Sequence, residues 1–293
     1  MMKPWHFWLI SVLILVVLFL YDQNNRIVVS KHRVKDFKIP NAFNGFKILH
    51  ISDLHNKSFG KNQSILLSII HKLNPDIILI TGDLIDRRRT DFKPVLHLLD
   101  GITQYPVYFV PGNHEAWSKH YVQLRELLLS KSVILLENEF QTLLRDEQSI
   151  MLYGLKDPGF YKQKDEKTSS RLILQATLEK WKPQGFSVLL SHRPEYFDLY
   201  AEHHMNITFS GHAHGGQIRF PFIGAIMAPH QGFFPKYSAG MYQMKISKLC
   251  LSRGLGNSLF PFRIFNHPEL ILVTLETNHS NDDSMKYSTN SLF

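Results

Sequence analysis

Five short apolar runs along the chain each end in a polar tip. The runs cover residues 47–51, 76–81, 107–110, 187–190 and 207–210. They are short and rich in Ile, Leu and Val, which is typical of buried strands in a central sheet. Apolar positions at helical spacing predict an amphipathic helix over residues 62–73, and we expect further helices over residues 92–99, 120–129 and 171–181. Strands that alternate with helices predict an α/β fold.

Further apolar runs complete the expected secondary structure. They predict strands over residues 133–136, 151–154, 236–246, 249–251 and 270–275. Residues 162–168 are polar, and we expect a loop there before the helix at residue 171. The chain shows no internal repeat and no second domain.

The tips of the five runs carry Asp, Asn or His directly after each strand. They are Asp53-Leu54-His55, Gly82-Asp83-Leu84-Ile85-Asp86, Gly112-Asn113-His114-Glu115, Ser191-His192 and Gly211-His212-Ala213-His214. Open α/β sheets bind ligands beyond the carboxyl ends of their strands. One D-x-H motif alone would be weak evidence, because an isolated His is usually a surface residue or a satisfied core residue. Five such tips, three with a Gly that lets backbone approach closely, are poorly explained in that way.

The side chains at the tips are donors suited to a metal ion. All are carboxylates, an amide or imidazoles, with no thiolate among them. This set favours first-row divalent metals such as Mn²⁺, Fe²⁺ or Zn²⁺ over calcium or an iron–sulfur cluster. There are too many donors for one tetrahedral ion and enough for two. We therefore expect two divalent metal ions.

The ordered set of motifs resembles the calcineurin-like metallophosphoesterase superfamily. The motifs span residues 53–214, and the resemblance covers about residues 45–276. The run His214-Gly215-Gly216-Gln217-Ile218-Arg219, the later Ser252-Arg253-Gly254-Leu255-Gly256 and the apolar start of the chain resemble the small membrane-anchored bacterial branch. Ser191 stands where many relatives have Gly, and Ala213 stands where Thr is frequent; neither change removes a ligand. The resemblance implies a four-layer α/β/β/α sandwich of two mixed sheets, preceded by one transmembrane helix.

The resemblance also implies a metal-dependent phosphoesterase and a role for each motif residue. Asp53, His55, Asp83 and His214 would hold the first metal, and Asp83, Asn113, His192 and His212 the second, so that Asp83 bridges them. A hydroxide shared by the two ions would attack phosphorus. His114 would protonate the leaving group, with Asp86 orienting its imidazole. Glu115 is expected to be structural.

An apolar segment over residues 5–21 predicts an uncleaved membrane anchor. It is close to the ~20 residues that a spanning helix needs, and aromatic residues lie towards both of its ends. No cleavage pattern of small residues follows it, which argues against a removed signal peptide. We expect a single-pass protein of the cell membrane. The side that the catalytic domain faces stays open, because the basic residues after the segment favour the cytoplasm while exported relatives point the other way.

These features predict four parts of the chain. They are an anchor over residues 1–25, a linker with the first strand over 26–44, a metallophosphoesterase domain over 45–276 and a polar, disordered tail over 277–293. Since no expected ligand precedes residue 26, removal of residues 1–25 should leave hydrolysis of a soluble diester nearly intact.

The composition of the chain indicates which classes of binding partner suit the protein. The net charge of +8 and the pI near 9.4 suit anionic partners such as phosphate esters or acidic lipid headgroups. No long basic run appears, so we do not expect nucleic acid, and a monomer is expected. Cys250 is the only cysteine, which excludes an intrachain disulfide. Arg87, Arg219 and Arg253 are candidate substrate-binding residues because they lie beside the motifs.

The substrate stays open at this stage. A phosphodiester or pyrophosphate of an envelope lipid or nucleotide-sugar lipid is favoured, since some relatives of the anchored branch cleave UDP-diacylglucosamine. The apolar residues 218–234 directly follow the last motif and would either contact lipid or pack as a strand of the second sheet. The alternatives are a nuclease or cyclic-nucleotide phosphodiesterase, and a non-catalytic scaffold with a retained metal site.

Overall fold

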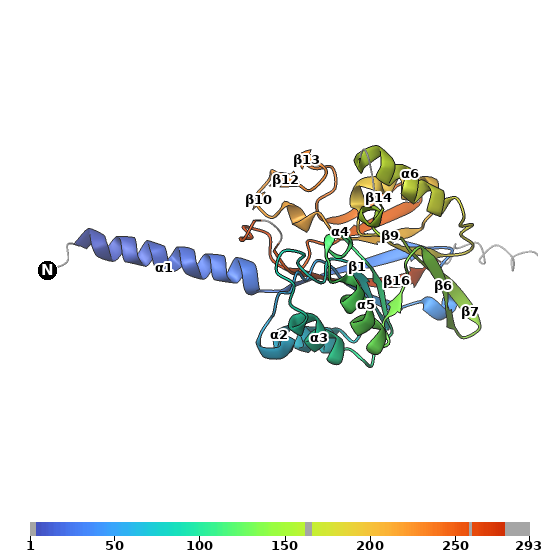
Figure 1. Ribbon diagram of the computed structural model, residues 1–293, viewed down its shortest axis with the longest axis horizontal. Helices are drawn as coiled ribbons and strands as arrows, with labels where there is room; N and C mark the ends of the chain where they lie inside the picture. Colours follow the sequence, from blue (N-terminus) through green and yellow to red (C-terminus); the bar gives the residue numbers. More distant parts are fainter. Residues whose placement is uncertain (1–3, 162–165, 258–259, 279–293) are drawn as a thin grey trace, which may run out of the picture.

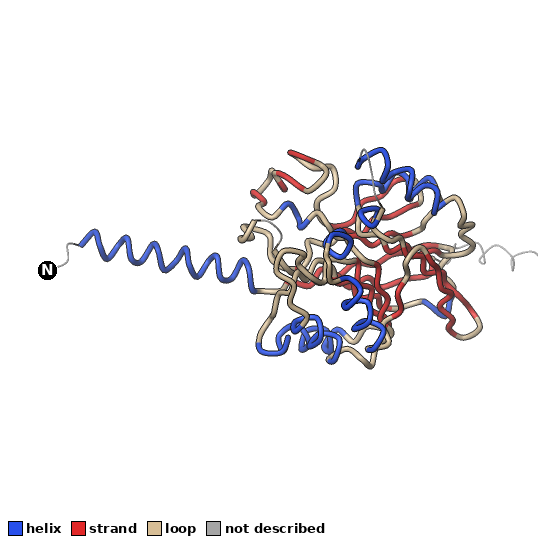
Figure 2. Tube along the Cα trace, viewed as in Figure 1, coloured by secondary structure: helices blue, strands red, loops and turns tan. Residues whose placement is uncertain are grey.

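The computed structural model describes residues 4–161, 166–257 and 260–278. Two six-stranded mixed sheets lie face to face, with helices on both outer faces (Figures 1 and 2). This is the four-layer α/β/β/α sandwich expected from the sequence. The polar, disordered tail was predicted over residues 277–293; Thr277 is instead the last residue of strand β16 (Glu269–Thr277), and residues 279–293 lie outside the described residues.

The first sheet has the order β1-β16-β2-β3-β4-β5, and the second has the order β14-β15-β9-β8-β7-β6. The strands of the first sheet are β1 (Val28–Asp36), β16 (Glu269–Thr277), β2 (Lys47–Ile51), β3 (Ile77–Thr81), β4 (Val107–Val110) and β5 (Ile134–Leu135). Those of the second are β14 (Gly240–Met244), β15 (Ser247–Leu251), β9 (Ile207–Ser210), β8 (Ser187–Leu190), β7 (Gln148–Gly154) and β6 (Glu139–Arg145). β2, β3 and β4 run parallel, as do β7, β8 and β9.

Strand residues alternate between two apolar layers, because successive side chains of a strand point to opposite faces. In β2, Leu49 and Ile51 face the outer helices, whereas Ile48 packs between the sheets against residues such as Val188 and Phe209 of the second sheet. The first sheet is covered by α2 (Ser64–Leu73), α3 (Lys93–Asp100) and α5 (Tyr121–Ser130), and the second by α6 (Glu166–Leu178) and α7 (Phe197–Glu202). Both faces of the central strands are therefore buried, which explains their continuous apolar runs.

Several elements differ from the expected ones, and three of these differences are informative. A 3-10 turn, η2 (Lys61–Gln63), precedes α2. The helix α6 begins at Glu166, inside the polar segment that was expected to be a loop. The strand β6 was not expected, because it is an edge strand whose residues are mostly exposed on both faces and carry no clear alternation.

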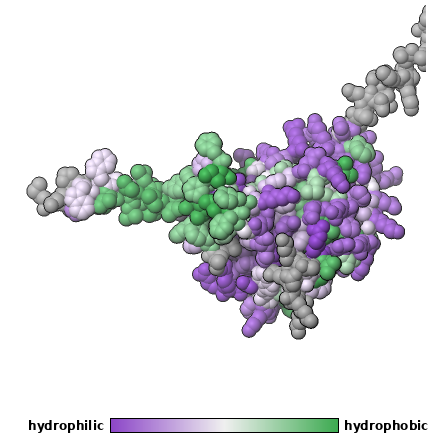
Figure 3. Space-filling view, turned by 90° about the horizontal axis from the view of Figure 1, so that it is seen from above, coloured by the Kyte–Doolittle hydropathy of each residue, from purple (hydrophilic) through white to green (hydrophobic). Residues whose placement is uncertain are grey.

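Outside the sheets, α1 (Pro4–Asn25) projects from the body as a long apolar helix (Figures 1 and 3). Within the described residues, its segment Trp5–Asn25 is long and apolar enough to cross a bilayer, and the most apolar 18-residue stretch of that segment is not buried. Only two residues separate α1 from β1, which pairs with β16. The segment expected to hold a linker and the first strand therefore has only a two-residue linker before β1, which is an integral strand of the first sheet.

Residues 218–234 form two small antiparallel ribbons rather than a strand of the second sheet. The ribbons are β10 (Arg219–Phe220) with β11 (Gly224–Ala225), and β12 (Met227–Ala228) with β13 (Gly232–Phe233). They lie at the end of the body from which α1 projects (Figure 1). Phe222, Phe233 and Phe234 are largely exposed there.

Candidate metal centre

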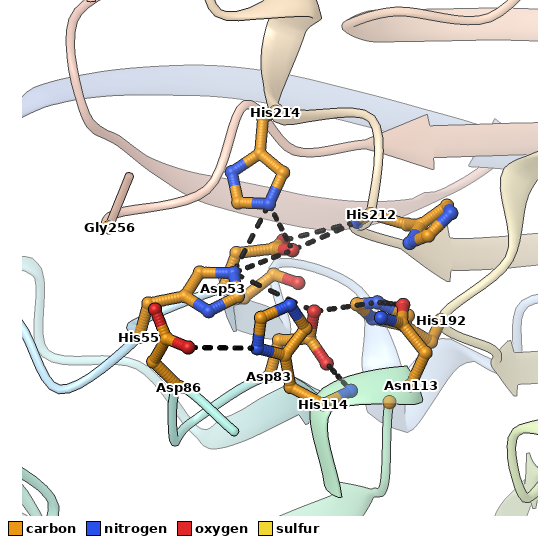
Figure 4. A network of polar contacts seen from close by, with 12 residues as sticks. Asp53, His55, Asp83, Asp86, Asn113, His114, His192, His212, His214 and Gly256 are labelled. Carbon is orange, nitrogen blue, oxygen red and sulfur yellow. Dashed lines mark hydrogen bonds and ion pairs between the residues drawn. The ribbon is translucent and has the colours of Figure 1, made fainter. Parts of the chain in front are cut away.

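All five tips meet where the two sheets end. β2, β3 and β4 of the first sheet and β8 and β9 of the second deliver them to one edge (Figure 4). Asp53, His55, Asp83, His212 and His214 all have positive φ values, between 46° and 70°. Such left-handed backbone costs on the order of 1–3 kcal/mol per residue and persists only where the surroundings over-determine it. Five strained residues in one cluster mark this edge as a functional site.

The first group of donors is Asp53, His55, Asp83 and His214. His55 Nε2 lies 3.2 Å from His214 Nε2 and 3.6 Å from Asp83 Oδ2, and His214 Nε2 lies 3.3 Å from Asp53 Oδ1. Burial lowers the pKa of His55 to about 3 and that of His214 well below its ordinary value. Both rings are therefore neutral and present a lone pair. Neutral imidazoles and carboxylates that converge on one point fit a cation.

The second group is Asp83, Asn113, His192 and His212. His192 Nδ1 lies 2.6 Å from the Thr81 carbonyl, so this nitrogen carries the proton and donates it. His192 Nε2 then faces acceptors, at 3.2 Å from Asp83 Oδ2 and 3.1 Å from Asn113 Oδ1. Either a proton or a metal ion must lie between His192 Nε2 and these two oxygens. Burial lowers the pKa of His192, but the Asp83 carboxylate outweighs burial and raises it to about 10, so a proton holds this position until a cation replaces it.

Asp83 belongs to both groups. Its Oδ2 contacts the His55 ring on one side and the His192 ring on the other, while its Oδ1 accepts the backbone N–H of His114 at 2.8 Å. Burial opposes ionisation, but His192 holds the pKa of Asp83 well below its usual range. An ionised carboxylate shared by two donor groups is suited to bridging two ions about 3.5–4 Å apart.

Glycines allow these loops to approach closely. A Cβ on Gly211 would collide with Ser52 Oγ and with the Asp53 carboxylate, and a Cβ on Gly112 would collide with Asp83 Oδ1. These two positions require glycine for steric reasons, as the motif pattern indicated.

His114 lies beside the first group, with its ring 4.4 Å from that of His55. Its Nδ1 accepts the backbone N–H of Arg87 at 3.2 Å, which places the proton of the neutral ring on Nε2. Asp86 Oδ1 is 3.7 Å from His114 Nδ1, too far for a hydrogen bond. Asp86 instead accepts two bonds from the Arg88 side chain. The Arg87 amide therefore sets the tautomer of His114, and the role of Asp86 in orienting that ring stays a prediction.

Glu115 has a definite structural task. It is fully buried and accepts the backbone N–H groups of Gly112, Asp83, Leu84 and Ile85 at 2.8, 2.7, 2.9 and 3.3 Å. It therefore joins the G-D-x-x-D loop to the G-N-H-E loop.

The three candidate substrate-binding arginines contact different parts of the structure. The Arg87 guanidinium packs over the Trp117 ring at 4.5 Å. Arg219 donates to the Gly215 carbonyl, and Arg253 forms an ion pair with Glu269 at 2.8 Å. Substrate contact by these three residues stays a prediction.

Sequence reasoning missed two residues beside His212. His230 Nδ1 lies 2.8 Å from His212 Nε2, and Arg193 Nη1 lies 3.4 Å from the same atom. Arg193 is itself held by Asp157 through two short bonds. The position of Arg193 directly after His192 was a usable signal, but His230 is a single histidine in an apolar segment and belongs to no motif.

Comparison with known proteins agrees with this geometry. The model of the calcineurin-like phosphoesterase family matches residues 46–216. The chain is 31% identical to the metallophosphoesterase YkuE of Bacillus subtilis over 265 residues, 88% of this chain and 89% of that protein. It is 27% identical to the phosphodiesterase YaeI of Escherichia coli, over 84% of this chain and 87% of that one. It is also 28% identical to a bovine transmembrane protein with metallophosphoesterase domain, over 82% of this chain and 55% of that protein.

The family model covers more than half of the chain, and the two donor groups fit the pair of divalent metal ions that calcineurin-like phosphoesterases use. The apolar helix α1 and relatives named as transmembrane proteins indicate a membrane protein. The chain belongs to the calcineurin-like phosphoesterase family and is a metal-dependent phosphoesterase.

Proposed function

We propose that this protein is a membrane-anchored phosphohydrolase that cleaves a phosphodiester or pyrophosphate bond of a lipid at the bilayer surface. The observation that carries the proposal is the exposed apolar surface beside α1. Phe222, Phe233 and Phe234 of the ribbons are 108%, 73% and 72% exposed. Apolar side chains gathered in this way mark an interaction surface rather than a solvated one.

The apolar surface of α1 continues onto the adjoining part of the body (Figure 3). Phe265 of the body contacts Phe19 of α1 with ring centroids 5.4 Å apart, and Phe265 is itself half exposed. The ribbons begin five residues after His214, at Arg219, and carry His230 against His212. A bilayer that contains α1 would therefore meet the ribbons, and a lipid headgroup there would lie close to the donor groups.

Within the proposal, Asp53, His55, Asp83 and His214 hold the first ion, and Asp83, Asn113, His192 and His212 the second. Such a pair of ions supplies a water activated at neutral pH and neutralises charge that develops on the phosphoryl oxygens. His114 carries its proton on Nε2 because the Arg87 amide occupies Nδ1, so its Nε2–H can donate a hydrogen bond to the leaving oxygen as charge develops there. Asp86 and Arg88 stabilise the loop that presents this amide.

The name of the relative YaeI, a phosphodiesterase, supports the diester class. The donor set is complete in both groups, which speaks against a non-catalytic scaffold. A nuclease needs a more strongly basic groove than a net charge of +8 supplies. Among lipid substrates, UDP-diacylglucosamine is a concrete candidate for the first assay.

Two substrates presented differently test the proposal. Hydrolysis of soluble bis-p-nitrophenyl phosphate is compared with hydrolysis of UDP-diacylglucosamine and a panel of lipid phosphodiesters in vesicles, with Mn²⁺ present. Replacing Phe233 and Phe234 with Ser should lower the rate on vesicle lipid and spare the soluble diester. Phe140→Ser is the matched control, because Phe140 is 55% exposed on β6, at the end of the body away from α1 (Figure 1).

Equal loss on both substrates, together with a lowered melting temperature, would mean that Phe233 and Phe234 are packing residues. The lipid reading of this surface would then fail. Absence of hydrolysis of every lipid in the panel, with the soluble diester still cleaved, would restrict the function to a soluble phosphodiester.

A further inference from the structure

The last turn of α1 differs from the rest of that helix. The side chains of residues 7–18 are exposed, whereas Gln23 is only 5% exposed and packs into the body. Gln23 Oε1 accepts the Asn266 N–H at 3.3 Å, and its Nε2 lies 3.0 Å from His267 Nε2. A buried polar side chain at the end of an exposed apolar helix needs a reason beyond membrane anchoring.

Asn24 makes a second set of contacts with the same part of the body. Its Oδ1 accepts the Arg263 N–H at 2.9 Å and the Asn257 side-chain amide at 3.1 Å. Its carbonyl accepts a bond from the Lys57 ammonium, two residues beyond His55. The end of α1 therefore bonds to two loops beside the first donor group: the loop that follows His55 and the loop that contains Asn257 and Arg263.

Arg263 carries the contact onward to Asp53. It is fully buried, and its guanidinium donates to the carbonyls of Arg253 and Gly256 at 2.9 and 2.5 Å. The Gly256 N–H in turn donates to the Asp53 carbonyl at 2.6 Å. Figure 4 shows Gly256 on the His55 and His214 side of the site. Asn24, Arg263 and Gly256 thus form a continuous chain of hydrogen bonds to the backbone of a candidate ligand.

Asn266 carries the contact to His214. It is fully buried, and its Nδ2 donates to the His214 carbonyl at 2.7 Å while its backbone N–H donates to Gln23. Asp53 and His214 have positive φ values of 53° and 49°. Residues in this backbone conformation keep it only when neighbouring contacts hold them there.

We propose that the last turn of α1, through Gln23 and Asn24, is a positioning element for Asp53 and His214 and so sets the metal affinity of the first donor group. The proposal rests on the ligand assignment under the proposed function. His192 is held separately, by its bond to the Thr81 carbonyl, and Asn113 lies on α4 (Asn113–Trp117). His212 of the second group contacts Asp53 through its backbone N–H, at 3.1 and 3.2 Å from the two carboxylate oxygens. The second donor group should therefore be much less sensitive to the end of α1 than the first.

This proposal changes the expectation for residues 1–25. They contain no candidate ligand, and sequence reasoning gave them no part in the site. Their last residues nevertheless support the backbone of two candidate ligands, so a chain cut after residue 25 should bind the first metal weakly.

The test uses the full-length protein in detergent, without substrate, and measures Mn²⁺ stoichiometry and affinity by equilibrium dialysis. The wild type should bind two Mn²⁺ ions. Asn24→Ala should retain one site and weaken the other by roughly 10- to 100-fold, the range found when outer-shell partners of metal ligands are removed. Gln23→Ala should act in the same direction through Asn266.

Two variants serve as controls. Asn24→Asp keeps the acceptor oxygen for Arg263 and Asn257 and loses only bonds donated by Nδ2, chiefly that to the Leu20 carbonyl of the same helix at 2.7 Å. It should therefore keep the affinity of both sites. Asn25→Ala removes a half-buried side chain whose bond runs to the Tyr21 carbonyl of the same helix, and it should bind as the wild type does.

Other outcomes would overturn the proposal. Wild-type affinity at both sites in Asn24→Ala and Gln23→Ala would do so, and so would equal weakening of both sites with a lowered melting temperature of the metal-free protein. A wild type that binds fewer than two Mn²⁺ ions would refute the ligand assignment itself, which separates that failure from failure of the positioning role.

Discussion

Glu115 offers the sharpest test of how the metal centre is held together. Its carboxylate accepts four backbone N–H groups, two on each oxygen: Gly112 and Asp83 on Oε2, and Leu84 and Ile85 on Oε1. In Glu115→Gln one oxygen becomes an NH₂ donor. Whichever way the amide is turned, two buried N–H groups then face a donor instead of an acceptor.

The expected magnitude follows from that count. A buried donor left without a partner costs about 1–3 kcal/mol. At the lower end of that range, about 1–1.5 kcal/mol for each donor, Glu115→Gln should destabilise the fold by about 2–3 kcal/mol and Glu115→Ala, which leaves four such donors, by about 4–6 kcal/mol. For a chain of this size, about 2–4 °C per kcal/mol places Glu115→Ala about 10–20 °C below the wild type in melting temperature.

The assay is thermal unfolding in one detergent, with Mn²⁺ affinity measured alongside. Burial raises the pKa of Glu115 to about 8, so the comparison belongs at about pH 9, where the carboxylate is ionised. Glu126→Gln on the exposed face of α5 is the matched control. If Glu115→Gln melted within about 1 °C of that control, well inside the shift that even 2 kcal/mol produces, Glu115 would not be the support of this loop pair.

Three further predictions concern the centre itself. Because Asp83 raises the pKa of His192 to about 10, a metal ion must displace a proton there. Mn²⁺ affinity measured by calorimetry should therefore fall as pH falls, by up to about tenfold per pH unit. An affinity that stays constant between pH 6 and 9 would contradict this. Asp83→Ala should lose both metals by mass spectrometry, whereas His114→Ala should keep both and lose roughly 10²–10⁴-fold in turnover, less with a p-nitrophenol leaving group; a lost metal in His114→Ala would refute its role. His230→Ala should weaken the second site roughly 10- to 100-fold and leave the first unchanged, and an unchanged second site would show that His230 does not support His212.

Much of the fold was predictable because its signal is local. The five central strands are buried on both faces, so each is a continuous apolar run that the sequence displays directly. The edge strand β6 has neither a buried face nor an alternating pattern and gave no signal. The start of α6 was missed for a related reason, since its first residues are polar.

The candidate ligands were predictable and their supports were not. Asp, Asn and His at strand ends form short motifs that can be read from the sequence. The positive φ values of Asp53 and Asp83 do not alter these motifs. The supports act across long sequence separations: Gln23 contacts Asn266 across 243 residues, and His50, buried beneath the site, bonds Thr81 on the neighbouring strand. Gln23 and Asn24 looked like the polar end of an anchor, because nothing local distinguishes a helix end that enters solvent from one that enters a site.

The way α1 joins the body limits how substrate reaches the centre. Val28 donates its N–H to the Pro268 carbonyl, and β1 then pairs along its length with β16, so the chain is fixed within three residues of the end of α1. Asp22 binds His267 at 2.9 Å and Arg26 at 2.9 Å, which ties the helix end to the same loop. If α1 spans the bilayer, the body has little freedom to swing away from it, and the ribbons that carry Phe222 and Phe233 stay at the surface. Under the proposed function, a lipid headgroup at that surface would lie close to His212, which the ribbons contact through His230.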